Sequence, residues 1–423
     1  MESFFFCAKV MSCISWQSIC YALGRPRTTC VQNVAYCLTS DNVMCTKILQ
    51  AISVGIDFFT EEERKFLSLF ADSVPFVESE LPDIKEIVSE LSIVTSQELT
   101  LLEPVTPTRS GTIAVVYYGK LDGKEVVIKV KRKGVESTYQ EGLRKMRTLA
   151  KITSWLPYIR MLRLQDIMEE NELDMLDQID FVQEVNNCIR SYKNFKRVET
   201  VKIPHVYDQF TSHNNDIIVM ERLRGVSLHE LSPDKRTLYA AINAKYFMKS
   251  VLYDGFYHAD MHQGNLFFTE ENGKPVLGVV DFGMCGSLRP EEQESFYRFF
   301  QQGWFKKDPI RAAEVMFNCL VRPQERVRML PEAERQRLIQ SLSIITGEIF
   351  HDHSDFDPST IYRVNNILRP YDLRLSRQFC KIQLALGVSA GVGKSLAVET
   401  PLMQTLENVI NEMFICSDIL TEL

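Results

Sequence analysis

The segment His258-Ala259-Asp260-Met261-His262-Gln263-Gly264-Asn265, followed by Asp281-Phe282-Gly283, decides the fold that we predict. An aspartate, an asparagine five residues later and the aspartate of D-F-G form the set with which phosphotransfer enzymes orient an acceptor and hold metal on nucleotide phosphates. Asp260, Asn265 and Asp281 have these types and this order. The sequence therefore predicts a centre for phosphoryl transfer.

The stretch between the two motifs predicts a β-hairpin that brings them together. Apolar runs at 266–268 and 276–280 flank Glu271-Asn272-Gly273-Lys274, in which Asn-Gly is a turn signal. Two paired strands would present the acidic groups to a single cleft. The alternative is a buried, hydrogen-bonded histidine in H-x-D and an ordinary turn at D-F-G. The order and spacing of both motifs together favour phosphotransfer.

A kinase cleft also needs a lysine on a strand, and Val126-Val127-Ile128-Lys129-Val130 supplies one. This run and residues 113–120 flank Leu121-Asp122-Gly123-Lys124, whose Asp-Gly pair predicts a hairpin turn. Arg109-Ser110-Gly111-Thr112 stands at the position of a phosphate-covering loop, so Gly111 and Thr112 are candidate nucleotide contacts. For the strand alone, an edge strand with a solvated lysine is the alternative.

Glu184 is the best candidate for the carboxylate that holds Lys129 toward the phosphates. The segment around Glu184 is also where the chain begins to resemble a known family. The resemblance is to the UbiB family of atypical kinases, the coenzyme Q biosynthesis type. The family patterns are D-F/Y-x-x-E-A-x-N, P-x-V-Y, V-M-E-x-x-x-G, H-A-D-x-H-P-G-N and D-F-G-M-x-G-x-L. Their counterparts in this chain lie at residues 180–187, 203–207, 219–225, 258–265 and 281–288.

Upstream, the family carries a K-x-G-Q helix that caps the nucleotide, and Lys47-Ile48-Leu49-Gln50 is similar to it. The later Ala71-Asp72-Ser73-Val74-Pro75 is similar to the family's L-Q-D-x-V-P and supports this register. The resemblance implies that Lys47 and Gln50 lie at the nucleotide. Leu49 replaces the family glycine, and its side chain obstructs a close backbone approach. Solvated residues of an ordinary helix are the alternative.

The resemblance implies an α+β fold, bilobal and protein-kinase-like, with a helical N-terminal extension. It also implies ATP and Mg²⁺ as cofactors. The implied roles are adenine binding at the Met220, Glu221 and Leu223 hinge, phosphate binding by Lys129 with Glu184, Mg²⁺ binding by Asn265 and Asp281, and orientation of water or an acceptor hydroxyl by Asp260. The implied outcome is ATP hydrolysis linked to lipid or isoprenoid quinone metabolism. Transfer to a protein or small molecule, and a nucleotide-binding scaffold without turnover, stay open as alternatives.

We expect three parts along the chain. These are a helical extension with the cap at 1–100, a kinase-like N-lobe at 101–225 and a helical C-lobe at 226–423. Apolar periodicity predicts helices at 81–91, 139–155, 161–195 and 238–253.

Composition limits the classes of partner that the chain is expected to bind. The chain has 423 residues, of which 45% are hydrophobic and 24% charged, so it can bury a large core. A net charge of −7 gives no basic footprint for nucleic acid. No stretch is long and apolar enough to predict a spanning helix. The nucleotide is the expected partner, contact with a lipid or membrane surface stays open, and the oligomeric state is not predicted.

The 11 cysteines include no C-x-x-C pair, and a chain with its own core needs no disulfide staples. We therefore expect reduced thiols and an intracellular, cytoplasmic location. Six cysteines lie within the first 45 residues at roughly heptad intervals, as if lining the buried side of helices. Acylation beside Phe4-Phe5-Phe6-Cys7, with peripheral membrane association, is the alternative.

Overall fold

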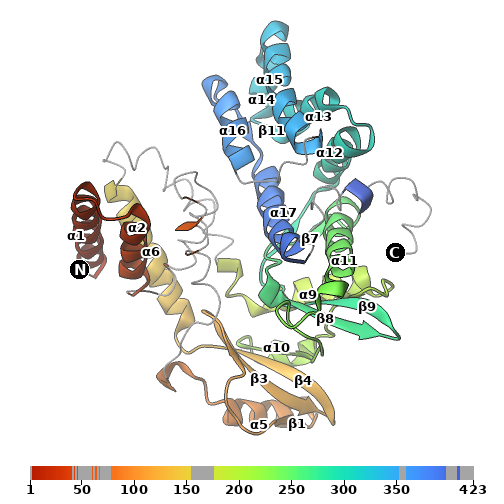
Figure 1. The fold of residues 1–423 in the computed structure, drawn as a ribbon. Coiled ribbons are helices and arrows are strands. Elements are labelled where there is room, and N and C mark those ends of the chain that lie inside the picture. Colours follow the sequence, from red (N-terminus) through yellow and green to blue (C-terminus); the bar gives the residue numbers. More distant parts are fainter. Residues whose placement is uncertain are drawn as a thin grey trace. The chain divides into compact units, whose positions relative to one another are not determined.

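The computed structural model describes residues 2–40, 42, 45, 60, 62–63, 66, 78–153, 176–351, 359–396 and 407–409. They fall into two compact units (Figure 1). Unit 1 comprises Met1–Val185 and Val206–Arg222, and unit 2 comprises Asn186–His205 and Leu223–Leu423. The three-part division expected from the sequence stays a prediction.

Unit 1 is built on an antiparallel sheet in the order β1-β3-β4-β6, with β2 paired to β3. Its strands are β1 (Leu99–Leu101), β2 (Arg109–Ser110), β3 (Ala114–Leu121), β4 (Lys124–Lys131) and β6 (Ile217–Glu221). The predicted hairpin of β3 and β4 is confirmed. Asp122 and Gly123 make its turn with φ of +48° and +81°, which Asp and Gly tolerate and which matches the strand twist.

One face of this sheet is covered by helix α5 (Ile84–Thr95), with α10 (Asp208–His213) beside β6. Because side chains alternate along a strand, β4 sends Val126, Ile128 and Val130 into this core. Lys129 therefore points to the opposite face of the sheet. The position of the lysine on its strand follows from this two-residue period.

A second core in unit 1 joins three helices, α1 (Glu2–Ala22), α2 (Arg27–Thr39) and α6 (Val135–Thr153). A short 3₁₀ turn, η2 (Glu78–Glu80), precedes α5.

The prediction of one continuous helix over 161–195 is wrong at its centre. Asp180 lies outside helical structure, and its carboxylate accepts from the Gln183 amide at 3.0 Å. A new helix, α9 (Phe181–Phe195), begins there, where the Asp180 carboxylate satisfies one of the free amides of its first turn; residues 154–175 lie outside the described part.

Unit 2 contains small sheets that hold the two sequence motifs. The strands are β5 (Val201–Lys202), β7 (Phe256–His258), β8 (Leu266–Glu271), β9 (Lys274–Val279), β10 (Cys285–Ser287), β11 (Val321–Arg322) and β12 (Arg374–Leu375). The predicted β8–β9 hairpin is confirmed, with Asn272 and Gly273 at φ of +53° and +75°. Strand β7 leads into the 258–265 loop and pairs with β10, which follows D-F-G, so the sheet itself brings the two motifs together.

The rest of unit 2 is mostly helical and encloses one large apolar core. The α-helices are α11 (Pro233–Leu252), α12 (Pro290–Phe300), α13 (Pro309–Val315), α14 (Gln324–Met329), α15 (Glu332–His351), α16 (Ser359–Leu368) and α17 (Arg377–Leu396). The 3₁₀ turns are η3 (Gln263–Asn265) and η6 (Arg369–Tyr371), and the π-helical segments are η4 (Gln301–Phe305) and η5 (Met316–Leu320). Among the described residues, no helix combines the length and apolarity needed to cross a membrane.

Candidate active site

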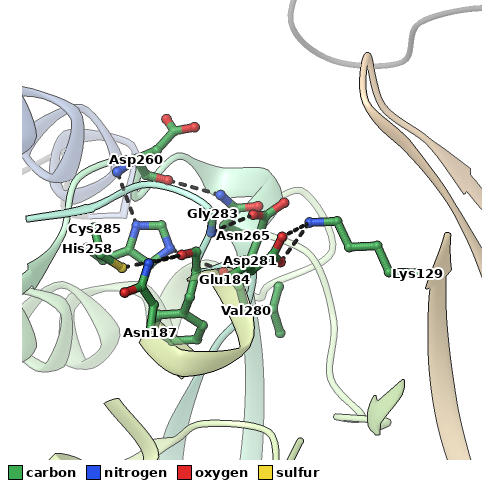
Figure 2. Close-up of polar contacts among 11 residues, drawn as sticks. Lys129, Glu184, Asn187, His258, Asp260, Asn265, Val280, Asp281, Gly283 and Cys285 are labelled. Atoms are coloured by element: carbon green, nitrogen blue, oxygen red, sulfur yellow. Dashed lines mark hydrogen bonds and ion pairs between the residues drawn. The ribbon is translucent and has the colours of Figure 1, made fainter. Parts of the chain in front are cut away.

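In unit 1, Lys129 of β4 and Glu184 of α9 form a close ion pair (Figure 2). The Lys129 Nζ lies 2.7 Å from Oε1 and 2.9 Å from Oε2 of Glu184. The glutamate side chain is 3% exposed and the lysine 14%, so the pair is largely removed from water. Two charges held this way keep both side chains in fixed positions.

Helix α9 presents a second group to the same lysine. Phe181 is one turn before Glu184, so both side chains lie on one face of the helix. The Lys129 Nζ lies 5.3 Å from the centre of the Phe181 ring, which is buried. The D-F-x-x-E spacing thus gives the lysine a carboxylate and an aromatic face from a single helical turn.

In unit 2, His258 connects the 258–265 loop with the segment before D-F-G. Its Nδ1 accepts from the Asp260 amide at 3.1 Å, and its Nε2 lies 3.3 Å from the Val280 carbonyl oxygen. Burial lowers the pKa of His258, which favours the neutral ring. Since Nδ1 accepts, the proton belongs on Nε2, which donates to Val280. The histidine therefore fixes the backbone of Asp260 beside the strand that leads to Asp281.

Asn265 is held between the same two segments. Its Nδ2 donates to the Asp260 carbonyl oxygen at 3.0 Å, and its own carbonyl oxygen accepts from the Val280 amide at 3.0 Å. The Asp260 carbonyl oxygen can only accept, so the Asn265 side chain must direct Nδ2 toward it. Oδ1 of Asn265 therefore points away from Asp260. Figure 2 shows Asn265 and Asp281 as neighbours, as their backbone connection through Val280 requires.

D-F-G has a constrained backbone. Asp281 has a φ of +61°, in the left-handed region that few residues other than glycine adopt, and its Oδ1 accepts from the Gly283 amide at 3.3 Å. The next residue, Phe282, is buried against the His258 ring, with the ring centres 5.2 Å apart. Its carbonyl oxygen accepts from Asn187 Nδ2 at 3.0 Å. These contacts hold an unfavourable backbone conformation at the predicted metal ligand.

The donor set in unit 2 fits a hard divalent cation. Asp281 offers a carboxylate, and Asn265 offers the Oδ1 that its hydrogen bond to Asp260 has oriented. Oxygen ligands of these two kinds are those that Mg²⁺ prefers, with water and phosphate completing the shell. Asn265 and Asp281 would hold Mg²⁺, which would supply charge neutralisation at the phosphates.

The remaining predicted site residues lie in separate places. Gly111 and Thr112 follow β2, where the Gly111 amide donates to the Ala114 carbonyl oxygen at 2.9 Å and Thr112 is buried. Met220 and Glu221 end β6 in unit 1, and Leu223 begins the second segment of unit 2. Lys47 and Gln50 lie outside the described residues. The roles of all these residues stay predictions.

The sequence predicts no role for Asn187 or His258, yet both position groups of this site. Asn187 lies three residues after Glu184 on α9, where it binds the D-F-G backbone. The sequence predicts His258 only as part of a motif, yet its ring joins the Asp260 backbone to Val280, next to Asp281. The i, i+3 spacing in D-F-V-Q-E-V-N-N is the signal that could have identified Asn187.

Replacing Glu184 with alanine should destabilise unit 1 strongly, because Lys129 would keep a charge in a largely buried place. We expect a loss of about 3 kcal/mol, at the low end for a broken buried pair since the lysine keeps some exposure. Thermal and urea unfolding would measure it. Glu2→Ala is the matched control, because its ion pair with Arg144 is exposed and should contribute at most ~1 kcal/mol. Equal losses in both variants would contradict a special role for the Lys129–Glu184 pair.

Asn187→Leu should destabilise unit 2 by about 1–3 kcal/mol, because the buried Phe282 carbonyl oxygen would lose its amide donor and keep only the weak Cys285 thiol at 3.6 Å. The neighbouring Asn186 is exposed on the same helix, so Asn186→Leu should change stability by less than ~0.5 kcal/mol. Melting temperatures of the two variants give the comparison. A silent Asn187→Leu would show that the D-F-G conformation does not depend on this bond.

A strand lysine paired with a helix glutamate, together with an H-x-D loop and D-F-G, defines a kinase-like phosphotransfer architecture. The ABC1 atypical kinase-like domain model matches residues 103–316, just over half of the chain. The chain therefore belongs to the ABC1 family of atypical kinases, and the predicted membership in the UbiB family is confirmed. The α+β, kinase-like fold class with a helical N-terminal extension is confirmed as well.

Two similar relatives are each named probable protein kinase UbiB. The one from Aeromonas salmonicida is 30% identical over 322 residues, which cover 73% of this chain and 57% of the relative. The one from Aeromonas hydrophila is 29% identical over 311 residues, which cover 71% and 55%. The chain thus spans a little over half the length of these relatives. A Mycobacterium tuberculosis protein solved as the Rv3197-erythromycin complex is similar at 19% identity and a TM-score of 0.49, covering 86% of this chain and 90% of that one.

Proposed function

We propose that this chain is a Mg²⁺-dependent, ATP-binding atypical kinase or ATPase of the UbiB type. Lys129, fixed by Glu184, contacts the α/β phosphates of ATP. Asn265 and Asp281 hold the metal, and Asp260 orients the attacking water or hydroxyl. Because phosphoryl transfer depends mainly on positioning and charge neutralisation, no covalent nucleophile is needed.

The observation that supports this proposal best is the set of hydrogen bonds in unit 2 that connects the 258–265 loop to the D-F-G segment. Through His258 and Asn265, the backbone of Asp260 is bonded to the segment that ends in Asp281. A merely structural turn would not need an oriented amide oxygen beside a carboxylate held at positive φ. The Lys129–Glu184 pair of unit 1 supplies the remaining charges of a kinase set.

The acceptor and the pathway rest on the family alone. From the resemblance of the sequence motifs to the UbiB family, we propose water as the acceptor and a link to lipid or isoprenoid quinone metabolism. We propose an intracellular, cytoplasmic setting with contact to a lipid surface, in line with a hydrophobic substrate. We place the adenine against Met220, Glu221 and Leu223 and propose that Gly111, Thr112, Lys47 and Gln50 cover the phosphates.

One purified sample can separate this enzyme from a nucleotide-binding scaffold. ATP affinity is measured by calorimetry, and phosphate release is followed on the same sample with Mg²⁺ present. The proposal expects saturable binding and turnover above a blank without protein. Binding without any release, also when lipid vesicles or candidate phenolic acceptors are added, would favour the scaffold.

A further inference from the structure

Three side-chain contacts fix the register between α1 and α2, the antiparallel helical hairpin of unit 1. Nearest the turn, Asn33 Nδ2 donates to Gln17 Oε1 at 3.2 Å. One turn farther out on each helix, the Cys13 thiol donates to the Asn33 carbonyl oxygen at 3.9 Å and lies against the Cys37 thiol. Beyond them, Lys9 Nζ donates to Ser40 Oγ at 3.3 Å. Each step away from the turn along α1 is therefore matched by an equal step away from the turn along α2.

This register predicts that a second cysteine pair faces across the hairpin. Cys20 lies three residues inward from Gln17, and Cys30 lies three residues inward from Asn33. Each is seven residues from the outer cysteine of its own helix, and two helical turns return a side chain to nearly the same face. Cys20 and Cys30 are both buried. In this register, Cys13 is level with Cys37, and Cys20 is level with Cys30.

We propose that the α1–α2 hairpin is a thiol modification site in which Cys13 pairs with Cys37 and Cys20 with Cys30 to form two interhelical disulfides. All four are free cysteines in the structure. The site goes beyond the proposed nucleotide chemistry and does not depend on it. It also goes beyond the interpretation of these cysteines as mere lining of a core.

Four cysteines on two helices could instead hold zinc, but their spacing is wrong for it. Seven residues of α-helix rise about 10 Å, so the outer and inner pairs are too far apart to share one ion with Zn–S bonds of about 2.3 Å. In the described part of the chain, no three side chains of the His, Cys, Asp and Glu types converge. The pairwise arrangement favours disulfides over a tetrahedral metal centre.

The oxidant we assign is a low-molecular-weight disulfide such as oxidised glutathione. One protein thiolate attacks it, which forms a mixed disulfide and releases one small thiol. The facing thiolate then attacks the protein sulfur of the mixed disulfide and releases the second small thiol. Two protein thiols are oxidised, one small disulfide is reduced to two thiols, and the two thiol protons pass to solvent or to the released thiolates.

The two pairs differ in access. Cys13 and Cys37 are partly exposed, whereas Cys20 and Cys30 are buried, so the outer pair should close first. Burial and the contact with Cys37 raise the pKa of Cys13 to about 11, so this thiol stays protonated at neutral pH. Closure should therefore accelerate as the pH rises. Cys37 also borders the core that α1 and α2 share with α6, so closure should raise the melting temperature of unit 1.

Peptide mapping of the whole chain tests the proposal. The reduced protein is equilibrated with mixtures of reduced and oxidised glutathione at neutral and mildly alkaline pH, quenched with acid and alkylated. Trypsin cleaves after Lys9, Arg27 and Lys47, so each disulfide would link peptide 10–27 to peptide 28–47. Fragment ions then identify the bonded cysteines. We expect Cys13–Cys37 first and Cys20–Cys30 at higher oxidant, while Cys319, which is partly exposed like the outer pair, stays alkylated or carries glutathione.

Two double variants provide a matched control. Cys20→Ser with Cys30→Ser keeps the outer pair and should form the link. Cys13→Ser with Cys30→Ser leaves Cys20 and Cys37, which the register separates by about two turns, and should form none. If both link equally, or if the parent carries only mixed disulfides at every glutathione ratio, the proposal is wrong. Circular dichroism of the reduced proteins, together with mapping of the parent, keeps the test decisive if a variant unfolds.

Discussion

Replacing Asp281 with asparagine should remove Mg²⁺-dependent nucleotide binding. The loss of a carboxylate ligand leaves the phosphate charge poorly neutralised, a contribution of several kcal/mol, so ATP affinity should fall about 100-fold or more. Asparagine suits the test because it also tolerates the left-handed backbone that Asp281 adopts at a φ of +61°. The fold should therefore survive, and calorimetry with Mg²⁺ present measures the effect.

Asp372→Asn is the matched control for this variant. Asp372 is another aspartate of unit 2 with a left-handed backbone, at a φ of +52°, and it pairs with Arg326 at the surface. Its replacement should leave ATP affinity unchanged. Equal affinity for ATP in the Asp281→Asn variant and the parent would remove the metal-binding assignment.

Asp260→Asn should leave ATP binding nearly intact and lower turnover. A positioned general base contributes about 10²–10⁴-fold to a rate, so phosphate release should fall by that factor. The backbone amide and carbonyl of residue 260, which bond to His258 and Asn265, remain in the variant, so the loop should keep its conformation.

The split between binding and rate distinguishes this role from a structural one. If Asp260→Asn lowers affinity and melting temperature along with turnover, Asp260 holds the loop and does not act on the acceptor. If turnover stays at the parent's level, another group orients the nucleophile.

Local chemistry explains which parts of the fold could be predicted from the sequence. Asp122-Gly123 and Asn272-Gly273 fix their hairpins, because few other pairs accept positive φ at both positions. The place of Lys129 on β4 follows from the strand period. Apolar periodicity predicts one continuous helix over 161–195, because periodicity does not detect a capping residue such as Asp180. The Asp180 carboxylate instead caps a new helix that begins at Phe181.

Long-range contacts explain what the sequence could not supply. The bond from Asn187 to Phe282 joins residues far apart in the chain, so no local pattern predicts it. The heptad spacing of the cysteines is visible in the sequence, but the pairing that we propose depends on where the turn between α1 and α2 falls. The Leu49-containing cap lies outside the described residues, so its contact with nucleotide remains a prediction.

The most direct test of the central claim is a titration of the unmodified chain with ATP, in the presence of Mg²⁺ and then with the metal removed by chelator. The proposed roles of Asn265 and Asp281 predict saturable binding with Mg²⁺ and a large loss of affinity without it. Binding that is absent under both conditions, or equally tight without metal, would contradict the assignment of this chain as a Mg²⁺-dependent, ATP-using kinase-like protein.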